Sequence, residues 1–299
     1  MLRAMYTSIS GLRNHQTMLD VVGNNIANVN TYGFKSSSTA FKTLLSQTMS
    51  GAGAPSPTLG GTNNIQVGLG MTVDSITQQF TQGGLQSTGV GTDLAIQGDG
   101  FFRTTNDPAL LAPPAPTAEI SYTRAGNFKW DGANAATAGM TRLVTSDGQF
   151  VVGFQDSDLV TAGFQLGAAP FTQGVIQYDA TTQSDPQIGA DGSVTVMDNP
   201  TGVRVTVAQL SMSRFSNPSG LTAVGNNRWQ ESLNSGAPVD DVPQQNGMGA
   251  LSAGYLEMSN VDLATEFTEM IKAQRGFQAN SRVITTSDEI LQELVNLKR

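Results

Sequence analysis

Apolar residues recur at alternating steps of three and four positions at both ends of the chain. This spacing repeats every seven residues and is typical of a coiled-coil seam. The pattern predicts one helix in 1–35 and one in 258–299, and we expect the two to pair. Ser259 and Asp262 have the spacing of a capping box ahead of the second helix. The apolar members of the two stripes are Leu2, Met5, Ile9, Leu12, Leu19, Ile26, Leu263, Phe267, Met270, Phe277, Ile284, Leu291 and Val295.

Burial of these stripe residues offsets only part of the entropy lost when two long terminal segments become ordered. The helix pair should therefore be marginal by itself. We expect the ends of a free chain to fray and to become ordered when copies pack side by side.

Between the two helices the pattern changes to short alternating strands separated by turns that contain Gly. The predicted fold class is mainly β with paired N- and C-terminal α-helices, that is, a β-rich body on a coiled-coil-like helical stalk. The body is expected over 67–257, with 36–66 as a linker or extension. Four prolines in 106–119 predict a surface loop. Residues 156–200 are a possible insertion or small outer lobe.

The composition of the chain indicates which kinds of binding partner to expect. Charged residues make up only 13% of the chain, which favours a surface that packs against other protein. A net charge of −8 argues against a nucleic-acid partner. No stretch has the ~18–20 apolar residues of a membrane span, so no membrane insertion is expected. The N-terminal segment is amphipathic, unlike a cleavable signal peptide, so an exported chain should keep it.

No motif predicts catalysis, a cofactor site or a metal site. The chain has no Cys and a single His, His15, inside the N-terminal helical pattern, where a structural role is expected. It contains no G-x-S-x-G elbow, phosphate loop or calcium loop. The chain is therefore expected not to be an enzyme. Two other classes stay open: a secreted carbohydrate-active β-protein with an unassigned carboxylate pair, and a membrane-active protein with amphipathic ends.

The stretch NNIANVNTYGFK, residues 24–35, closely resembles the signature of the bacterial flagellar axial proteins, which are the rod and hook proteins. The segments 82–102, 122–128 and 259–299 resemble the same family. The resemblance covers about 1–105, 121–155 and 203–299, whereas 106–120 and about 156–200 have no counterpart in it. The signature residues singled out here are Asn24, Asn25, Asn28, Asn30, Tyr32, Gly33, Phe34 and Lys35.

Asparagine competes with the helical backbone for hydrogen bonds and tolerates left-handed conformations. The four asparagines should therefore end the first helix. Gly33 should permit a turn, which Tyr32 and Phe34 can anchor. The resemblance implies a further role for this segment in contacts between subunits. The simpler alternative is a helix stop only.

The resemblance implies that the terminal helices line the channel of a helical tube and that the β body lies outside. It implies export through the flagellar type III export apparatus and assembly as a homo-polymer next to other axial proteins, the hook–filament junction protein and the hook cap. Within the family the chain looks most like the short hook proteins. We therefore predict an extracellular hook subunit, a universal joint that transmits torque. The alternative is the distal rod protein of the cell envelope, a stiff drive shaft.

Overall fold

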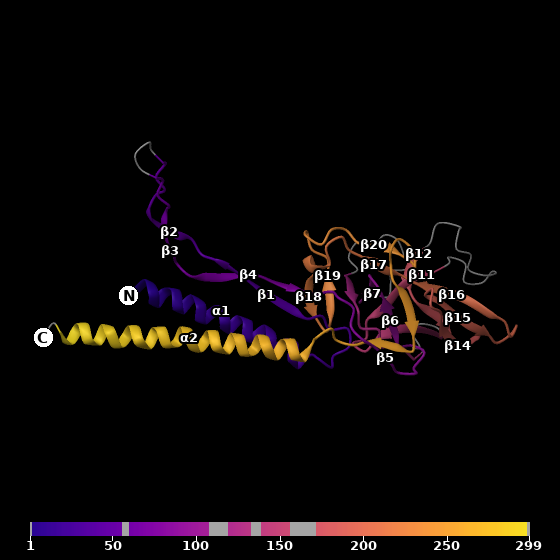
Figure 1. The fold of residues 1–299 in the computed structure, drawn as a ribbon. Helices are drawn as coiled ribbons and strands as arrows, with labels where there is room; N and C mark the ends of the chain where they lie inside the picture. The colour runs from indigo at the N-terminus through magenta and orange to yellow at the C-terminus, as the bar shows by residue number, and fades with distance from the viewer. Residues whose placement is uncertain (1, 56–59, 108–118, 133–138, 156–171, 298–299) are drawn as a thin grey trace. The chain divides into compact units, whose positions relative to one another are not determined.

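Two compact units make up the computed structural model, which describes residues 2–55, 60–107, 119–132, 139–155 and 172–297. The first unit contains Met1–Val29, Ser36–Gln79 and Val261–Arg299, and the second contains Asn30–Lys35 and Phe80–Asn260. The predicted fold class is confirmed, since helices from the two ends of the chain pair and the remainder is mainly strand (Figure 1).

The first unit is built on two antiparallel helices, α1 (Leu2–Ala27) and α2 (Leu263–Asn296). Two antiparallel strand pairs accompany them. Strand β1 (Ser37–Thr43) pairs with β4 (Met71–Gln78), and α1 contacts both strands. Strand β2 (Ser46–Ser50) pairs with β3 (Ile65–Gly68) and forms a ribbon that projects away from the helices (Figure 1).

Because of these strand pairs, the observed domain boundaries differ from the predicted ones. Residues 36–66, predicted as a linker or extension, contain β1, β2 and the start of β3. The body begins at Phe80 rather than at residue 67, because β4 pairs with β1 and so belongs to the helical unit. The helix start also differs: Asp262 is the N-cap, and its Oδ1 accepts the Ala264 N–H at 2.9 Å, whereas Ser259 lies upstream of the helix.

The second unit is a β body. Fourteen of its described strands form one sheet with the path β14-β15-β16-β11-β7-β8-β19-β18, onto which β9, β10, β12, β13, β17 and β20 pair. Two further pairs are β21–β6 and β22–β5. The bounds are β5 Leu85–Ser87, β6 Leu94–Gln97, β7 Phe101–Thr105, β8 Ile120–Thr123, β9 Phe128–Trp130, β10 Met140–Thr145, β11 Phe150–Gln155, β12 Thr172–Val175, β13 Gln177–Asp179, β14 Gln183–Ile188, β15 Ser193–Asp198, β16 Arg204–Leu210, β17 Met212–Arg214, β18 Thr222–Gly225, β19 Arg228–Gln230, β20 Val239–Asp241, β21 Ala250–Ala253 and β22 Tyr255–Glu257.

Two apolar clusters hold the body together. The larger contains Leu94, Phe102, Val151 and Leu210 among its members, drawn from four strands that are far apart in sequence. The smaller is aromatic, with Phe101, Tyr122, Phe215 and Trp229 packed edge to face. Both clusters lie wholly inside the second unit. The body therefore has its own core, independent of α1 and α2.

The two segments with unusual composition lie partly outside the described residues. Most of the predicted surface loop at 106–119, namely 108–118, is outside them, as are 156–171 of the predicted insertion. The described remainder of that insertion, 172–200, contains β12–β15, which pair within the fourteen-stranded sheet. This part of the chain therefore belongs to the sheet of the body.

Candidate assembly surface and motif turn

The pairing of α1 with α2 has one regular antiparallel register. A Cβ placed on Gly11 would lie 2.6 Å from Nδ2 of Asn280, and one on Gly276 would lie 2.5 Å from Nε2 of His15. Asn25 Nδ2 donates to Oε1 of Glu266 at 3.0 Å. Each step forward along α1, from Gly11 to His15 and on to Asn25, is matched by an equal step backward along α2. The two helices therefore stay in register along the described length of α1.

Small and polar residues, together with Val22, form the centre of this seam. The buried positions of α1 are Ser8, Gly11, Val22 and Asn25, and those of α2 are Ala273 and Ser287. The helices approach closely because Gly11 and Gly276 leave room for the side chains opposite them. The seam runs beside the predicted apolar stripe, and sequence reasoning missed it because it followed apolar residues only.

The predicted stripe residues lie at the flanks of the seam. Met5, Ile9, Leu12, Leu19 and Ile26 on α1, and Met270, Phe277, Ile284 and Leu291 on α2, are half-buried. Leu263, Phe267 and Val295 are exposed, Phe267 by 49% and Val295 by 68%. The side chain of Leu2 lies outside the described part of the chain. The flanks are therefore apolar surface that the helix pair does not bury by itself.

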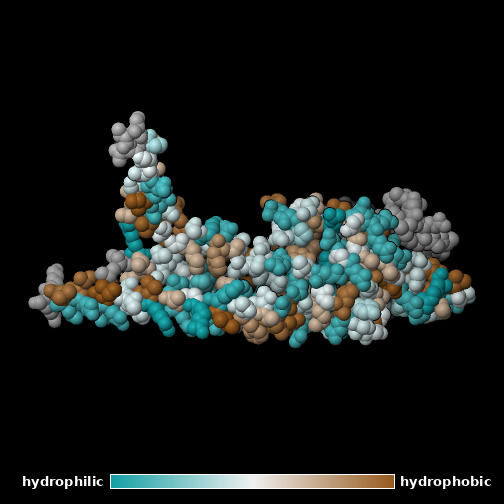
Figure 2. Space-filling view, in the orientation of Figure 1, coloured by the Kyte–Doolittle hydropathy of each residue, from teal (hydrophilic) through white to brown (hydrophobic). Residues whose placement is uncertain are grey.

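Further apolar side chains extend this exposed surface on α2. Near its start Ile271 joins Leu263 and Phe267, and toward its end Val283, Ile290, Leu294 and Leu297 are exposed. The register places the last turns of α2 beyond the N-terminal end of α1, and hydrophobic surface lines this end in Figure 2. Exposed apolar side chains grouped in this way are common at sites of protein interaction.

The asparagine-rich signature is used inside the chain. Asn25 is buried, and its amide also donates to the Ser37 carbonyl at 2.8 Å while its Oδ1 accepts the Ser37 N–H at 3.0 Å. Asn28 donates back to the Asn24 carbonyl at 2.9 Å where α1 ends. Asn24 and Asn30 are exposed. The prediction that this cluster ends the helix is confirmed, and its role between subunits stays a prediction.

Burial raises the pKa of Glu266, and the hydrogen bond from Asn25 opposes this rise. Glu266 stands in the first turn of α2, where a carboxylate is favoured by the helix dipole. The Asn25 amide therefore joins the end of α1 to both the start of α2 and the start of β1.

The turn after α1 depends on Gly33. Its φ is +68°, and its N–H donates to the Glu257 carbonyl at 2.8 Å. A Cβ at this position would lie 2.6 Å from the backbone nitrogen of Ala125. Tyr32 and Phe34 on either side are half-buried, and the Tyr32 carbonyl accepts from Asn227 at 2.9 Å. Glycine is thus required here both for its conformation and for its lack of a side chain.

Gly33→Ala should lower the free energy of unfolding of the body by about 3 kcal/mol or more, because left-handed strain and a backbone clash act together. Gly89→Ala is the matched control, since Gly89 has φ +70° but no atom within 4 Å of the place that a Cβ would take. The control should cost about 1–2 kcal/mol from strain alone. Urea denaturation measures both values, and equal losses would contradict the close approach to Ala125.

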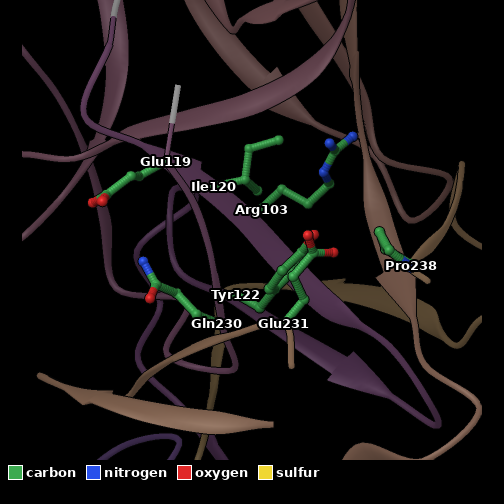
Figure 3. Close-up of a pocket in the computed structure, with 7 residues that line it drawn as sticks. All are labelled: Arg103, Glu119, Ile120, Tyr122, Gln230, Glu231 and Pro238. Atoms are coloured by element: carbon green, nitrogen blue, oxygen red, sulfur yellow. The ribbon is translucent and has the colours of Figure 1, made fainter. Parts of the chain in front are cut away.

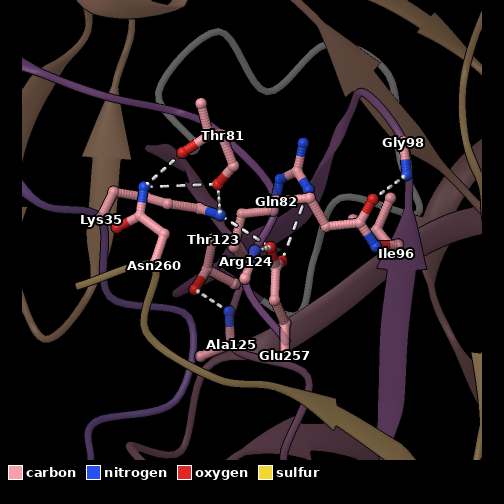
Figure 4. A network of polar contacts seen from close by, with 11 residues as sticks. Lys35, Thr81, Gln82, Ile96, Gly98, Thr123, Arg124, Ala125, Glu257 and Asn260 are labelled. Carbon is pink, nitrogen blue, oxygen red and sulfur yellow. Dashed lines mark hydrogen bonds and ion pairs between the residues drawn. The ribbon is translucent and has the colours of Figure 1, made fainter. Parts of the chain in front are cut away.

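Lys35 ends the signature in a buried ionic cluster (Figure 4). Its Nζ donates to Oε1 of Glu257 at 2.7 Å and to the Thr81 carbonyl at 2.7 Å. Arg124 Nη1 lies 3.4 Å from the other Glu257 oxygen. The side chains of Lys35 and Glu257 are 0% exposed and that of Arg124 is 2% exposed. Burial lowers the pKa of Lys35 and of Arg124, and in both cases the Glu257 carboxylate opposes this effect.

A pocket of about 420 Å³ opens on another part of the body (Figure 3). Its lining includes two carboxylates, Glu119 and Glu231, together with Arg103 and Tyr122. Arg103 is paired with Asp240 at 3.1 Å. Burial raises the pKa of Tyr122 to about 12, so its phenol stays protonated at neutral pH. The carbohydrate-active alternative requires two carboxylates that face each other, whereas those of Glu119 and Glu231 lie on different sides of this pocket (Figure 3).

The described residues also bear on metal binding and on membrane insertion. No group of three or more His, Cys, Asp or Glu residues in that part of the chain is arranged to hold a metal ion. Neither described helix is long and apolar enough to cross a membrane.

Comparison with known proteins identifies the family. Three family models match: "Flagella basal body rod protein" at 5–35, "Flagellar hook protein FlgE/F/G D1 domain" at 95–196 and "Flagellar basal body rod FlgEFG protein C-terminal" at 252–297. The flagellar basal-body rod protein FlgG of Bacillus subtilis is 47% identical over 300 positions, covering 100% of both chains. This chain belongs to the flagellar rod and hook protein family. It is a structural flagellar axial protein.

Two relatives from Borreliella burgdorferi represent the rod and hook branches of the family. Its rod protein FlgG is 38% identical over 301 positions, and its hook protein FlgE is 30% identical over 442 positions, each covering 100% of both chains. The D1 model also spans most of 156–200, for which the sequence analysis found no counterpart in the family. That expectation was wrong, because the described part of this segment is integral to the sheet.

Proposed function

We propose that this flagellar axial protein is the distal rod subunit, a component of the stiff drive shaft within the cell envelope. The observation that carries the proposal is the end-to-end match with rod proteins over 300 and 301 positions. The match with a hook protein spreads the same 299 residues over 442 positions and therefore needs long gaps. The sequence analysis favoured the hook, and the comparisons support its alternative, the rod.

The helix pair supplies the mechanism of assembly in this proposal. Leu263, Phe267 and the apolar end of α2 stay exposed in the single chain, so neighbouring copies are the surfaces that cover them. The stripe residues at the flanks of the seam then become buried between subunits. Adjoining axial proteins at each end of the rod and the type III export apparatus are its further partners. Covering these flanks also stabilises helices that are marginal in a free chain.

A gene-replacement experiment tests the rod assignment. The chain is expressed in one Bacillus subtilis strain that lacks its own FlgG and in another that lacks its hook protein. We expect swimming to return in the first strain only, because only the rod position accepts this chain. Immunoblots of sheared cells control for export in both strains. Recovery of the hook-deficient strain alone would overturn the proposal.

A further inference from the structure

The ionic cluster of Lys35, Arg124 and Glu257 lies where the chain enters and leaves the β body. The chain first enters the body at Asn30; Lys35 is the last body residue before Ser36, and Phe80 and Asn260 are the body residues at the two later passages. Lys35 Nζ holds the Thr81 carbonyl, next to Phe80. The passages at 35, 80 and 260 are called the three connections below.

Hydrogen bonds join all three connections to this cluster. Asn260 Nδ2 donates to Thr81 Oγ1 at 2.8 Å (Figure 4). The Gly83 N–H donates to Oε1 of Glu257 at 3.0 Å, which is the oxygen that Lys35 also binds. The Gly33 N–H donates to the Glu257 carbonyl. One residue, Glu257, thus receives hydrogen bonds from the first and second connections and stands three residues before the third.

The charges of this cluster do not balance. Two buried cations, Lys35 and Arg124, share one buried carboxylate, and Nε of Arg124 has no hydrogen-bond partner among the described residues. Desolvation of charges opposes folding, and a buried ion pair is often no more stabilising than apolar side chains of similar size. Apolar side chains at these positions would stabilise the body at least as well as the ionic cluster does. A role in selecting one conformation therefore explains the cluster better than a role in stability.

We propose that Lys35, Glu257 and Arg124 form a clasp that fixes the three connections in one conformation. Lys35 is the positioning residue of the clasp: it holds the Thr81 carbonyl and the Glu257 carboxylate together, and the stability of the body does not depend on it. The mechanical role of the clasp rests on the proposed function. A rod subunit transmits torque, and connections fixed in one conformation would transmit it between the body and the helices.

Hydrogen exchange of the full-length chain with Lys35→Met tests the clasp. Methionine fills a similar volume and leaves Glu257 paired with Arg124 alone. We expect the amides of Gly33 and Gly83 to exchange about tenfold faster or more, since local opening no longer breaks a charged hydrogen bond. Strands β7 and β16 of the body should keep their protection. Thermal melting followed by tryptophan fluorescence should change by no more than about 3 °C.

Lys42→Met is the matched control, because Lys42 forms an exposed ion pair with Asp74 in the other unit. It should leave exchange at Gly33 and Gly83 unchanged. Asn260→Ala is a second variant, which removes the hydrogen bonds from the Asn260 side chain to Thr81, and it should speed exchange around Thr81 by about threefold. A Lys35→Met chain that does not fold would itself overturn the proposal, because the stability of the body would then depend on Lys35.

Two outcomes would overturn the clasp. Unchanged exchange at Gly33 and Gly83 would show that Lys35 does not fix the connections. Faster exchange throughout the body, with a large fall in melting temperature, would make the cluster an ordinary part of the core. The torque role is tested separately by swimming of cells that carry Lys35→Met, which we expect to be lost. Because exchange is measured on the free chain, it reports on the clasp even where the rod assignment fails.

Discussion

Removal of Leu263–Arg299 is expected to abolish polymerisation and swimming while the β body stays folded. Both apolar clusters of the body lie outside α2, so the truncated body retains its core. The loss removes half of the helix pair and the exposed apolar residues along α2. Pelleting by ultracentrifugation measures polymer, and tryptophan fluorescence reports the body, because both tryptophans, Trp130 and Trp229, lie in it.

A point substitution sharpens this prediction. Phe267→Asp places a charge on the exposed flank of α2 and should greatly reduce polymer formation, because burying an unpaired carboxylate against another subunit is costly. Gln278→Asp, at an exposed polar position of the same helix, is the control and should have a smaller effect. Tubes formed by the truncated chain would contradict the assembly role of α2.

Glu257→Ala is expected to cause the largest loss of stability among single substitutions in the body, roughly 3–5 kcal/mol. The carboxylate is fully buried and is the anion that accompanies Lys35 and Arg124. Its removal takes away the carboxylate that pairs with both cations and leaves the Gly83 N–H without this acceptor. Urea denaturation followed by tryptophan fluorescence gives the free energy of unfolding.

Asp74→Ala is the control for this substitution. Asp74 pairs with Lys42 at 3.0 Å, but both side chains are at least half exposed, so the loss should stay below about 1 kcal/mol. The contrast between the two variants separates a buried, charge-compensating carboxylate from a solvated one. Similar losses in both would contradict the role assigned to Glu257.

The helices could be predicted from the sequence because apolar residues repeat with a heptad spacing that few other structures share. The residues at the centre of the contact between the helices could not be predicted, since Gly11, Gly276 and Ser8 carry no hydrophobic signal. Close approach of two helices depends on the absence of a side chain, which a search for apolar positions does not detect. A search for small residues at the same spacing beside the stripe is the signal that could have found it.

The turn that follows the asparagine-rich signature was likewise only partly predictable from the sequence. The asparagines and Gly33 indicated that a helix ends and the chain turns. Lys35 gave no sign of its partner, because Glu257 lies 222 residues away along the chain. Strand β1 was likewise hidden in an expected linker, since its pairing with β4 crosses the Gly- and Pro-rich stretch between them. Pairings of such separation depend on tertiary structure.

Immunogold electron microscopy of isolated hook–basal bodies, with antibody against the β body of this chain, tests the central claim most directly. The proposed rod function predicts gold confined to the straight segment within the cell envelope. A strain that lacks the chain provides the labelling control. Gold along the curved segment outside the cell would contradict the rod assignment and would identify the chain as a hook subunit.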